Sequence, residues 1–360
     1  MIKRIGIVTG GGDCPGLNAV IRAVVKAADR HGWESVGILG GYEGLLPPCK
    51  TLKLDYRALD GLLTRGGTIL GTANRGKFSA KVGHGDSRAL PRELMDEVKA
   101  GMEALKLDAL VSIGGDGSLS IAQQMFEHGI PIVGVPKTID NDLQGTMMTF
   151  GFDSAVACAT EALDRLHSTA ESHNRIMILE VMGRYAGWIA LFAGIAGGAD
   201  VILIPEVPFH YESACAKIQD REKHNKRFTM VIVAEGARPQ DGQFVSQGEG
   251  QGDREARLGG IGNVIAAELE KRTGKEARVC VLGHLQRGGT PTAFDRALCS
   301  IFGTEAVELL ARGEFGKMVA FLGSQVAAID IKEAVSKLKT VNPEGSLMKT
   351  ARALGICLGD

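Results

Sequence analysis

Three aspartates in two short polar segments are the strongest candidates for chemistry in this sequence. Asp116 lies in Gly114-Gly-Asp-Gly-Ser118, and Asp140 and Asp142 lie in Thr138-Ile-Asp-Asn-Asp142. If the second segment is extended, its two carboxylates point the same way, so a cation or a shared proton must offset their repulsion. Carboxylates are hard oxygen ligands that suit Mg²⁺, and one of them can accept the proton of an attacking hydroxyl. Phosphoryl transfer requires this combination of groups.

Both segments also have simpler interpretations. The first can be a glycine-rich turn in which Ser118 caps a helix. The second can be a solvated acidic turn. In the catalytic interpretation, Lys137, Thr138 and Asn141 supply hydrogen-bond donors around the carboxylates.

A third segment, Gly10-Gly-Gly-Asp-Cys-Pro-Gly16, lies between a predicted strand and a predicted helix. Its backbone amides and the positive end of the helix can hold an anion such as phosphate, although a plain tight turn is the alternative. It is not a dinucleotide-binding fingerprint, because Pro15 stands where that motif needs its last glycine. Residues 71–77 have Walker spacing, but Phe78 follows them, so the hydroxyl that would bind Mg²⁺ is missing.

Basic side chains recur beside the apolar runs in the second half of the chain. Guanidinium groups suit phosphate oxygens, and the charge that develops on a transferring phosphoryl group needs a fixed cation. Each of these residues alone is more often a surface charge, and Glu235 can either accept sugar hydroxyls or pair with a nearby arginine. The basic candidates are Arg175, Arg184, Arg278, His284 and Arg287.

Short apolar runs that alternate with amphipathic stretches must position these segments. The pattern is typical of strand–helix–strand units and predicts an α/β fold with a mostly parallel sheet. In such sheets ligands bind beyond the carboxyl ends of the strands, where the polar segments fall. The predicted strands are 5–9, 109–113, 132–135, 176–181, 201–204, 230–234 and 279–282. The predicted helices are 17–31, 154–171, 259–272 and 292–311, and the polar stretch 237–260 predicts a long surface loop.

The composition is that of a globular protein without a strong net charge. The chain has 360 residues, enough for two lobes, and 41 Lys and Arg balance 42 Asp and Glu. We therefore expect small-molecule partners, no nucleic acid and no membrane. The seven cysteines are odd in number and never form Cys-x-x-Cys, which favours reduced thiols in the cytoplasm. The first residues predict no signal peptide, and no uncharged stretch reaches the length of a membrane span.

The order of the motifs resembles that of the 6-phosphofructokinase family, from Ile5 to about Gly323. One such motif can arise by chance, but several in the family's order cannot reasonably do so. The motifs that carry the resemblance are Gly10-Gly-Gly-Asp-Cys-Pro-Gly-Leu-Asn18, Gly114-Gly-Asp-Gly-Ser118, Thr138-Ile-Asp-Asn-Asp142, Met182-Gly-Arg-Tyr185 and Gly283-His-Leu-Gln-Arg-Gly-Gly289.

The resemblance implies a phosphofructokinase-like α/β fold with two lobes, each a mostly parallel sheet flanked by helices. It implies phosphorylation of the 1-hydroxyl of fructose 6-phosphate, a step of glycolysis. Residues 1–151 and 286–336 would form the lobe that binds ATP and magnesium. Residues 152–285 and 337–360 would form the sugar-phosphate lobe.

The resemblance also implies roles for individual residues. Asp140 matches the catalytic base, with Thr138, Lys137 and Arg184 as further catalytic positions, and Asp116 and Asp142 are the expected metal ligands. The donor-binding positions are Gly11, Gly12, Arg75, Gly115, Asp116, Gly117 and Ser118; Arg75 stands one residue after the family's arginine between donor and sugar. The substrate-binding positions are Thr138, Asp140, Arg175, Met182, Gly183, Arg184, Glu235, Arg278, His284 and Arg287. In the family the matches of Arg175 and Arg278 reach across a subunit interface to the 6-phosphate, which implies a homo-oligomer, a tetramer or dimer, with shared active sites.

The identity of the phosphoryl donor depends on two positions. ATP users of the family have glycine where Gly117 stands, whereas pyrophosphate users have an aspartate that fills the place of the nucleotide's α-phosphate. Lys137 instead resembles the lysine of pyrophosphate users, and the combination is similar to the family's mixed subgroup. We expect ATP, because glycine removes the barrier to the α-phosphate and a lysine can serve either donor; pyrophosphate is the alternative.

Other functions fit the sequence less well. Gly-Gly-Asp-Gly also appears in NAD kinases and diacylglycerol kinases, but the Met182-Gly-Arg and His284-x-x-Arg segments argue against these. The missing fingerprint disfavours an NAD-dependent oxidoreductase, and the intact base at Asp140 disfavours a nucleotide sensor without catalysis.

Overall fold

The computed structural model describes residues 2–73, 76–78, 89–245 and 258–360. The chain divides into two compact units, one of Met1–Ser154 with Arg287–Leu338 and one of Ala155–Gln286 with Lys339–Asp360. The chain therefore passes between the units three times. Within the described part of the chain, no helix has both the length and the apolar character needed to cross a bilayer.

The first unit is built on a seven-stranded sheet in the order β11-β10-β5-β4-β1-β2-β3. Its interior strands are parallel, and the two edge strands, β3 and β11, pair antiparallel with their neighbours. The strands are β1 (Arg4–Thr9), β2 (Glu34–Ile38), β3 (Thr51–Leu54), β4 (Ala109–Gly114), β5 (Ile132–Pro136), β10 (Lys317–Phe321) and β11 (Val326–Asp330).

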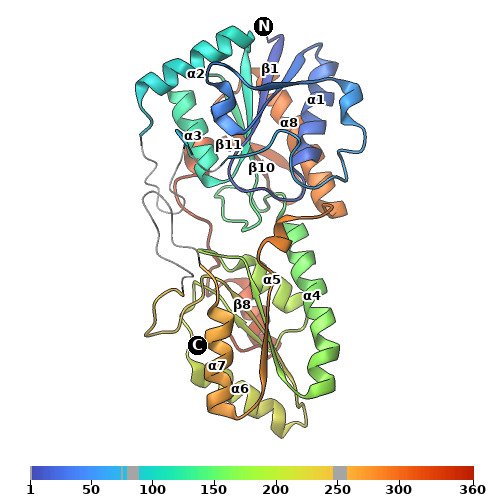
Figure 1. Ribbon diagram of the computed structural model, residues 1–360, viewed down its shortest axis with the longest axis vertical. Helices are drawn as coiled ribbons and strands as arrows, with labels where there is room; N and C mark the ends of the chain where they lie inside the picture. The colour runs from blue at the N-terminus through green and yellow to red at the C-terminus, as the bar shows by residue number, and fades with distance from the viewer. Residues whose placement is uncertain (1, 74–75, 79–88, 246–257) are drawn as a thin grey trace. The chain divides into compact units, whose positions relative to one another are not determined.

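Helices cover both faces of this sheet. Helices α1 (Leu17–Arg30) and α8 (Ala293–Arg312) pack side by side on one face, and α2 (Arg92–Leu105) and α3 (Asp116–Glu127) lie on the other (Figure 1). Buried residues of α2 and α3 join those of β4 in one apolar cluster that also contains Ile331 of the short helix α9 (Ile331–Ala334). The 3₁₀ turns η1 (Gly41–Leu45) and η2 (Tyr56–Leu59) complete the unit.

The second unit is built on a four-stranded parallel sheet in the order β7-β8-β6-β9. Helices α6 and α7 share an apolar cluster with one face of the sheet, and α4 and α5 lie on the other face (Figure 1). The strands are β6 (Ile176–Val181), β7 (Val201–Leu203), β8 (Thr229–Ala234) and β9 (Ala277–Val281). The helices are α4 (Phe152–His173), which begins in the first unit, α5 (Trp188–Ala196), α6 (Tyr211–Lys223), α7 (Ile261–Thr273) and α10 (Ser346–Ala353), and the turn η3 (Gly283–Arg287) follows β9.

The predicted α/β class, with mostly parallel sheets flanked by helices, is confirmed. The largest error in a predicted strand boundary is at β9, which begins at Ala277 rather than at Val279, so Arg278 lies inside this strand and not before it. Within the predicted loop 237–260, residues 246–257 lie outside the described part of the chain. The described residues on either side carry only isolated bridges, at Pro239 and at Leu258, before α7 begins.

Candidate active site

A pocket in the first unit lies beyond the carboxyl ends of three neighbouring strands, β1, β4 and β5. Each strand is followed by one of the polar segments that the sequence analysis identified, and all three segments line the pocket. Parallel strands bring their carboxyl ends to the same edge of a sheet, which explains why segments so far apart in the sequence meet here. The lining residues are Gly11, Gly12, Asp13, Gly40, Tyr42, Glu43, Ala73, Phe78, Gly115, Asp116, Gly117, Ser118, Ile121, Lys137, Thr138, Ile139, Asp140, Asp142 and Arg287.

The glycines of two of these segments are needed because Ser118 lies between them. A methyl group on Gly10 would lie 2.5 Å from Oγ of Ser118, and one on Gly114 would lie 2.3 Å from its Cβ. Gly11 has φ +75°, a conformation that favours glycine. The close approach leaves the first residues of α3 at the pocket wall, where backbone amides and the positive end of the helix can hold phosphate oxygens.

The alternative in which Ser118 caps a helix is wrong. Helix α3 begins at Asp116 with Gly115 as its N-cap, and no side chain among the described residues caps it. Ser118 is the third residue of the helix, and its side chain instead packs against the glycine segments.

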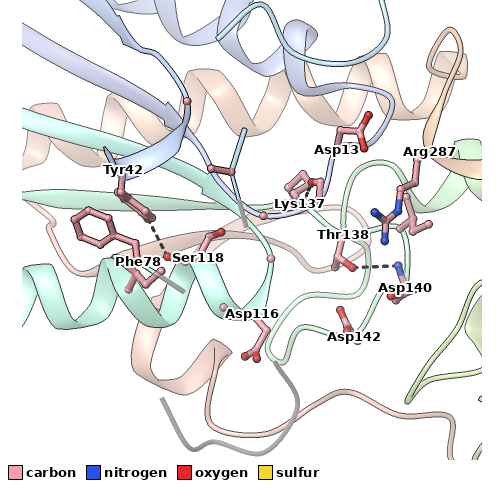
Figure 2. A pocket seen from close by; sticks show the side chains of 18 of the residues that line it. Asp13, Tyr42, Phe78, Asp116, Ser118, Lys137, Thr138, Asp140, Asp142 and Arg287 are labelled. Carbon is pink, nitrogen blue, oxygen red and sulfur yellow. Dashed lines mark hydrogen bonds between the residues drawn. The ribbon is translucent and has the colours of Figure 1, made fainter. Parts of the chain in front are cut away.

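The carboxylates of Asp116, Asp140 and Asp142 line the same pocket, as Figure 2 shows. The expectation that Asp140 and Asp142 point alike along an extended segment was wrong, because Asn141 between them has φ +50°.

Side-chain hydrogen bonds hold this turn. Oγ1 of Thr138 accepts from the backbone N of Asp140 at 3.1 Å. The Asn141 side chain accepts from the backbone N of Thr149 at 3.1 Å and donates to the carbonyl of Met147 at 3.2 Å. The left-handed turn, and not strand alternation, brings both carboxylates to the pocket.

Two basic side chains face the carboxylates. Lys137 is buried, and its Nζ donates a hydrogen bond to the carbonyl of Gly12. Burial lowers the pKa of Lys137 from its usual value. The guanidinium of Arg287 lies over the same loop, since a methyl group on Gly12 would be 3.1 Å from its Nη1.

An apolar wall at one end of the pocket was not predicted from the sequence. Tyr42 and Phe78 lie there with ring centroids 5.7 Å apart, and Ile121 of α3 also lines the pocket. Figure 2 shows these two rings at the end away from Asp140 and Arg287. The sequence analysis considered Phe78 only for the hydroxyl it lacks. The Gly40-Gly41 pair after β2 is a sequence signal that could have pointed to Tyr42, but it was not used.

The second unit holds most of the predicted sugar-phosphate residues. Met182, Gly183 and Arg184 follow β6, Glu235 follows β8 and His284 follows β9, and these three strands are neighbours. The backbone N of Gly236 donates to the carbonyl of Gly183 at 3.1 Å, which joins the segments after β6 and β8.

Arg175 and Arg278 lie at the opposite end of the same sheet. Arg175 precedes β6, and Arg278 is the second residue of β9. Both guanidinium groups form ion pairs with Glu276. Strand β6 has 6 residues, so about 20 Å separates this pair from the segment that begins at Met182. Arg175 and Arg278 therefore cannot reach the phosphate of a sugar held at Met182–Arg184 of the same unit. The other predicted donor residue, Arg75, lies outside the described residues.

The sequence profile described as "Phosphofructokinase" matches residues 4–310 of this chain. The chain belongs to the phosphofructokinase family. Its ATP-dependent 6-phosphofructokinase relative from Chloroflexus aurantiacus is 52% identical over 99% of this chain and 98% of the relative. ATP-dependent 6-phosphofructokinase 1 of Synechocystis sp. is also 52% identical, over 100% of this chain and 99% of the relative. The crystal structure of Pichia pastoris phosphofructokinase in the T-state matches with a TM-score of 0.79 and 30% identity, over 98% of this chain and 36% of the yeast chain.

The carboxylates that line the pocket can supply part of the coordination shell of a divalent metal ion. In the described ranges, no three Asp, Glu, His or Cys side chains are grouped closely enough to bind a metal ion alone. Asp116 and Asp142 do line the pocket beside the amides of α3. One or two carboxylates completed by phosphate oxygens are the usual surroundings of Mg²⁺, so the pocket fits a metal that arrives with a phosphate donor.

Proposed function

We propose that this chain is an ATP-dependent 6-phosphofructokinase, which transfers the terminal phosphoryl group of ATP to the 1-hydroxyl of fructose 6-phosphate. Curated relatives of that name match nearly the whole chain at 52% identity. The proposal rests on one observation: the glycine segments, three carboxylates and an aromatic wall line the same pocket. The phosphates of a nucleotide fit the glycine segments, and its purine ring fits the apolar wall formed by Tyr42 and Phe78.

The lining favours ATP over pyrophosphate as the donor. Gly117 brings neither bulk nor charge to the phosphate end of the pocket. Tyr42 and Phe78 add apolar surface, which a purine can cover and pyrophosphate cannot. Lys137 serves either donor, because its ammonium is held at the carbonyl of Gly12 whichever phosphate lies nearby.

Asp140 acts as the general base in this proposal. It accepts the proton of the 1-hydroxyl while the hydroxyl oxygen attacks the terminal phosphorus in line. The bond from that phosphorus to its bridging oxygen breaks, and ADP leaves with the electron pair. Lys137, Arg184 and Thr138 stabilise or orient the transferring group, with Arg184 assigned on the family resemblance.

We propose Mg²⁺ as the metal, held by Asp116 and Asp142 together with phosphate oxygens. When bound, it neutralises charge on the donor. We also propose that the protein works in the cytoplasm, in glycolysis, which agrees with free thiols on all seven cysteines.

Met182–Arg184, Glu235 and His284 are assigned to the sugar phosphate on the family resemblance, and Arg287 is assigned on the same ground. Arg175 and Arg278 are assigned to the 6-phosphate bound by a neighbouring subunit. The distance along β6 supports this assignment, since the two arginines lie at the far end of their own sheet. A homo-oligomer with shared sites follows from it.

A coupled assay with fructose 6-phosphate and either ATP or pyrophosphate tests the donor. We expect turnover with ATP and little with pyrophosphate. Gly117→Asp places a carboxylate beside the phosphates, so turnover with ATP should fall by roughly 10²-fold. Faster turnover of the native chain with pyrophosphate would reject ATP as the donor, and no turnover with either donor would reject the proposed activity.

A further inference from the structure

Tyr42 has a hydroxyl that is buried behind the pocket and joins two elements of the first unit. Its oxygen lies 2.5 Å from Oγ of Ser112 in β4 and donates to the carbonyl of Ser118 in α3 at 2.8 Å. Because the bond to the Ser118 carbonyl uses the phenolic proton, the hydroxyl of Ser112 donates to the Tyr42 oxygen. All three residues are buried. Burial raises the pKa of Tyr42, so the hydroxyl keeps its proton at physiological pH.

Ser118 is the residue around which the phosphate-binding segments are packed. Its side chain lies where methyl groups on Gly10 and Gly114 would be, and a methyl group on Gly11 would lie 3.3 Å from its Oγ. A shift of Ser118 therefore moves the first turn of α3 against the segment after β1. The Tyr42 hydroxyl opposes such a shift, because it ties the Ser118 carbonyl to the central strand β4.

The ring of Tyr42 belongs to a different part of the same site. It forms the apolar wall with Phe78, and its Cε2 would lie 3.7 Å from a methyl group on Gly10 (Figure 2). The Tyr42 side chain thus contacts the place proposed for the purine ring and also holds the turn proposed to bind the phosphates.

We propose that the Tyr42 hydroxyl, with Ser112, is a positioning group that sets the Gly115–Ser118 turn for the phosphates of the donor. The inference rests on the proposed function, in which that turn binds the nucleotide's phosphates. It gives Tyr42 two separate roles. The ring contacts the purine ring of the nucleotide, and the hydroxyl positions the phosphate-binding turn through Ser118. Loss of the hydroxyl therefore impairs use of the donor and leaves the affinity for the sugar phosphate unchanged.

The variant Tyr42→Phe keeps the ring and removes only the hydroxyl. We expect kcat/KM for ATP to fall by roughly tenfold, the effect of one lost buried hydrogen bond that leaves a polar partner behind, with part of the loss in kcat. KM for fructose 6-phosphate should stay within about twofold. Ser112→Ala should act in the same direction, and the double variant should be no worse than Tyr42→Phe, because both changes break one link.

Ser35→Ala is the matched control. Ser35 is another buried serine of the same sheet, in β2, and its Oγ has no hydrogen-bond partner among the described residues. This change should leave both KM values unaltered. A purely structural role for the Tyr42 hydroxyl predicts a lower melting temperature with unchanged kcat/KM for ATP, and that result would overturn the inference. An equal rise in KM for both substrates would also overturn it.

Calorimetric binding of Mg·ADP separates this inference from the proposed function. Weaker binding of Mg·ADP to Tyr42→Phe than to the native chain supports the positioning role. If the native chain also fails to phosphorylate fructose 6-phosphate, that failure counts only against the proposed function. Equal binding to both proteins, together with equal kcat for ATP, overturns the positioning role alone. A native chain that binds no Mg·ADP overturns both.

Discussion

Asp140 is placed by its neighbours in a way that suits a proton acceptor. The hydroxyl of Thr138 holds its backbone N–H, and the bonds of Asn141 fix the left-handed turn that follows. The carboxylate faces a pocket that Lys137 and Arg287 also line. If Asp140 is the base, as proposed, these bonds hold it in position for the hydroxyl.

We predict that Asp140→Asn lowers kcat by about 10²–10⁴, because an amide cannot accept the proton. The KM for ATP should change little, since the glycine segments and α3 are untouched. Steady-state kinetics with the coupled assay checks both expectations. Asp96→Asn, on the exposed face of α2, is the control and should behave as the native chain does. Turnover of Asp140→Asn at the native rate would exclude Asp140 as the base.

At this scale the sequence predicted residue types better than it predicted geometry. The three aspartates were identified from their surroundings in the chain, and they do line one pocket. The extended path through Asn141 was wrong, because hydrogen bonds to Met147 and Thr149 decide that residue's backbone and neither bond is visible as a pattern. Tyr42 was missed for a related reason: it becomes part of the pocket only through contacts with β4 and α3.

At the scale of elements, helices α4 and α8 begin side by side and cap one another. Asp295 in the first turn of α8 accepts from the backbone N and the hydroxyl of Ser154 in α4, at 2.9 and 2.6 Å. Thr292, the N-cap of α8, donates through its Oγ1 to Asp153 at 2.5 Å and accepts at the same atom from the backbone N of Asp295. Capping of this kind satisfies the backbone N–H groups that a helix leaves open at its start.

This junction predicts a pH dependence of stability. Burial raises the pKa of Asp295 from 3.8 to about 6. Between about pH 4 and 6 the Asp295 carboxyl keeps its proton in the folded chain but has released it in the unfolded chain. The contribution of Asp295 to the free energy of unfolding therefore falls as the pH rises through that window. The loss amounts to at most ~3 kcal/mol once the pH exceeds both pKa values.

The comparison of native chain and Asp295→Asn isolates this effect. An asparagine has no proton to release, so its carbonyl oxygen can still accept from Ser154 at every pH. The free energy of unfolding of the variant, minus that of the native chain, should therefore increase as the pH rises from 4.5 to 7. Urea unfolding at each pH measures both values. A difference that stays constant with pH would show that Asp295 does not titrate in this window.

The sequence predicted the long elements of this fold more accurately than its edges. Helix α8 was expected over 292–311 and spans Ala293–Arg312, because a long helix carries many buried positions at helical spacing. Strands β2, β3, β10 and β11 were not predicted. The residues of the edge strands β3 and β11 are mostly exposed or half-buried, so these two strands lack the continuous apolar run that marks most interior strands.

At the scale of the whole molecule, the arginines of the second unit have the clearest consequence. Arg175 and Arg278 share Glu276 at the amino ends of β6 and β9, and Met182–Arg184 and His284 lie at the carboxyl ends. Two groups that bind one sugar phosphate must lie within its reach, which is far shorter than the ~20 Å of β6. If both groups serve the proposed reaction, each chain completes a site in another copy.

Mixing two inactive variants tests this consequence directly. Asp140→Asn lacks the proposed base, and Arg278→Ala lacks the arginine proposed to act in a neighbouring subunit's site, so each alone should have low activity at limiting fructose 6-phosphate. In oligomers that are dissociated together and reassembled at a one-to-one ratio, random pairing gives about a quarter of the sites both native groups, so activity should return to about that fraction. The control mixture of Asp140→Asn with Asp142→Asn should gain nothing, because both residues line the same pocket of one chain and no site regains both. If the first mixture also stays inactive although the two variants co-assemble, Arg278 does not act across an interface and the active site belongs to one chain.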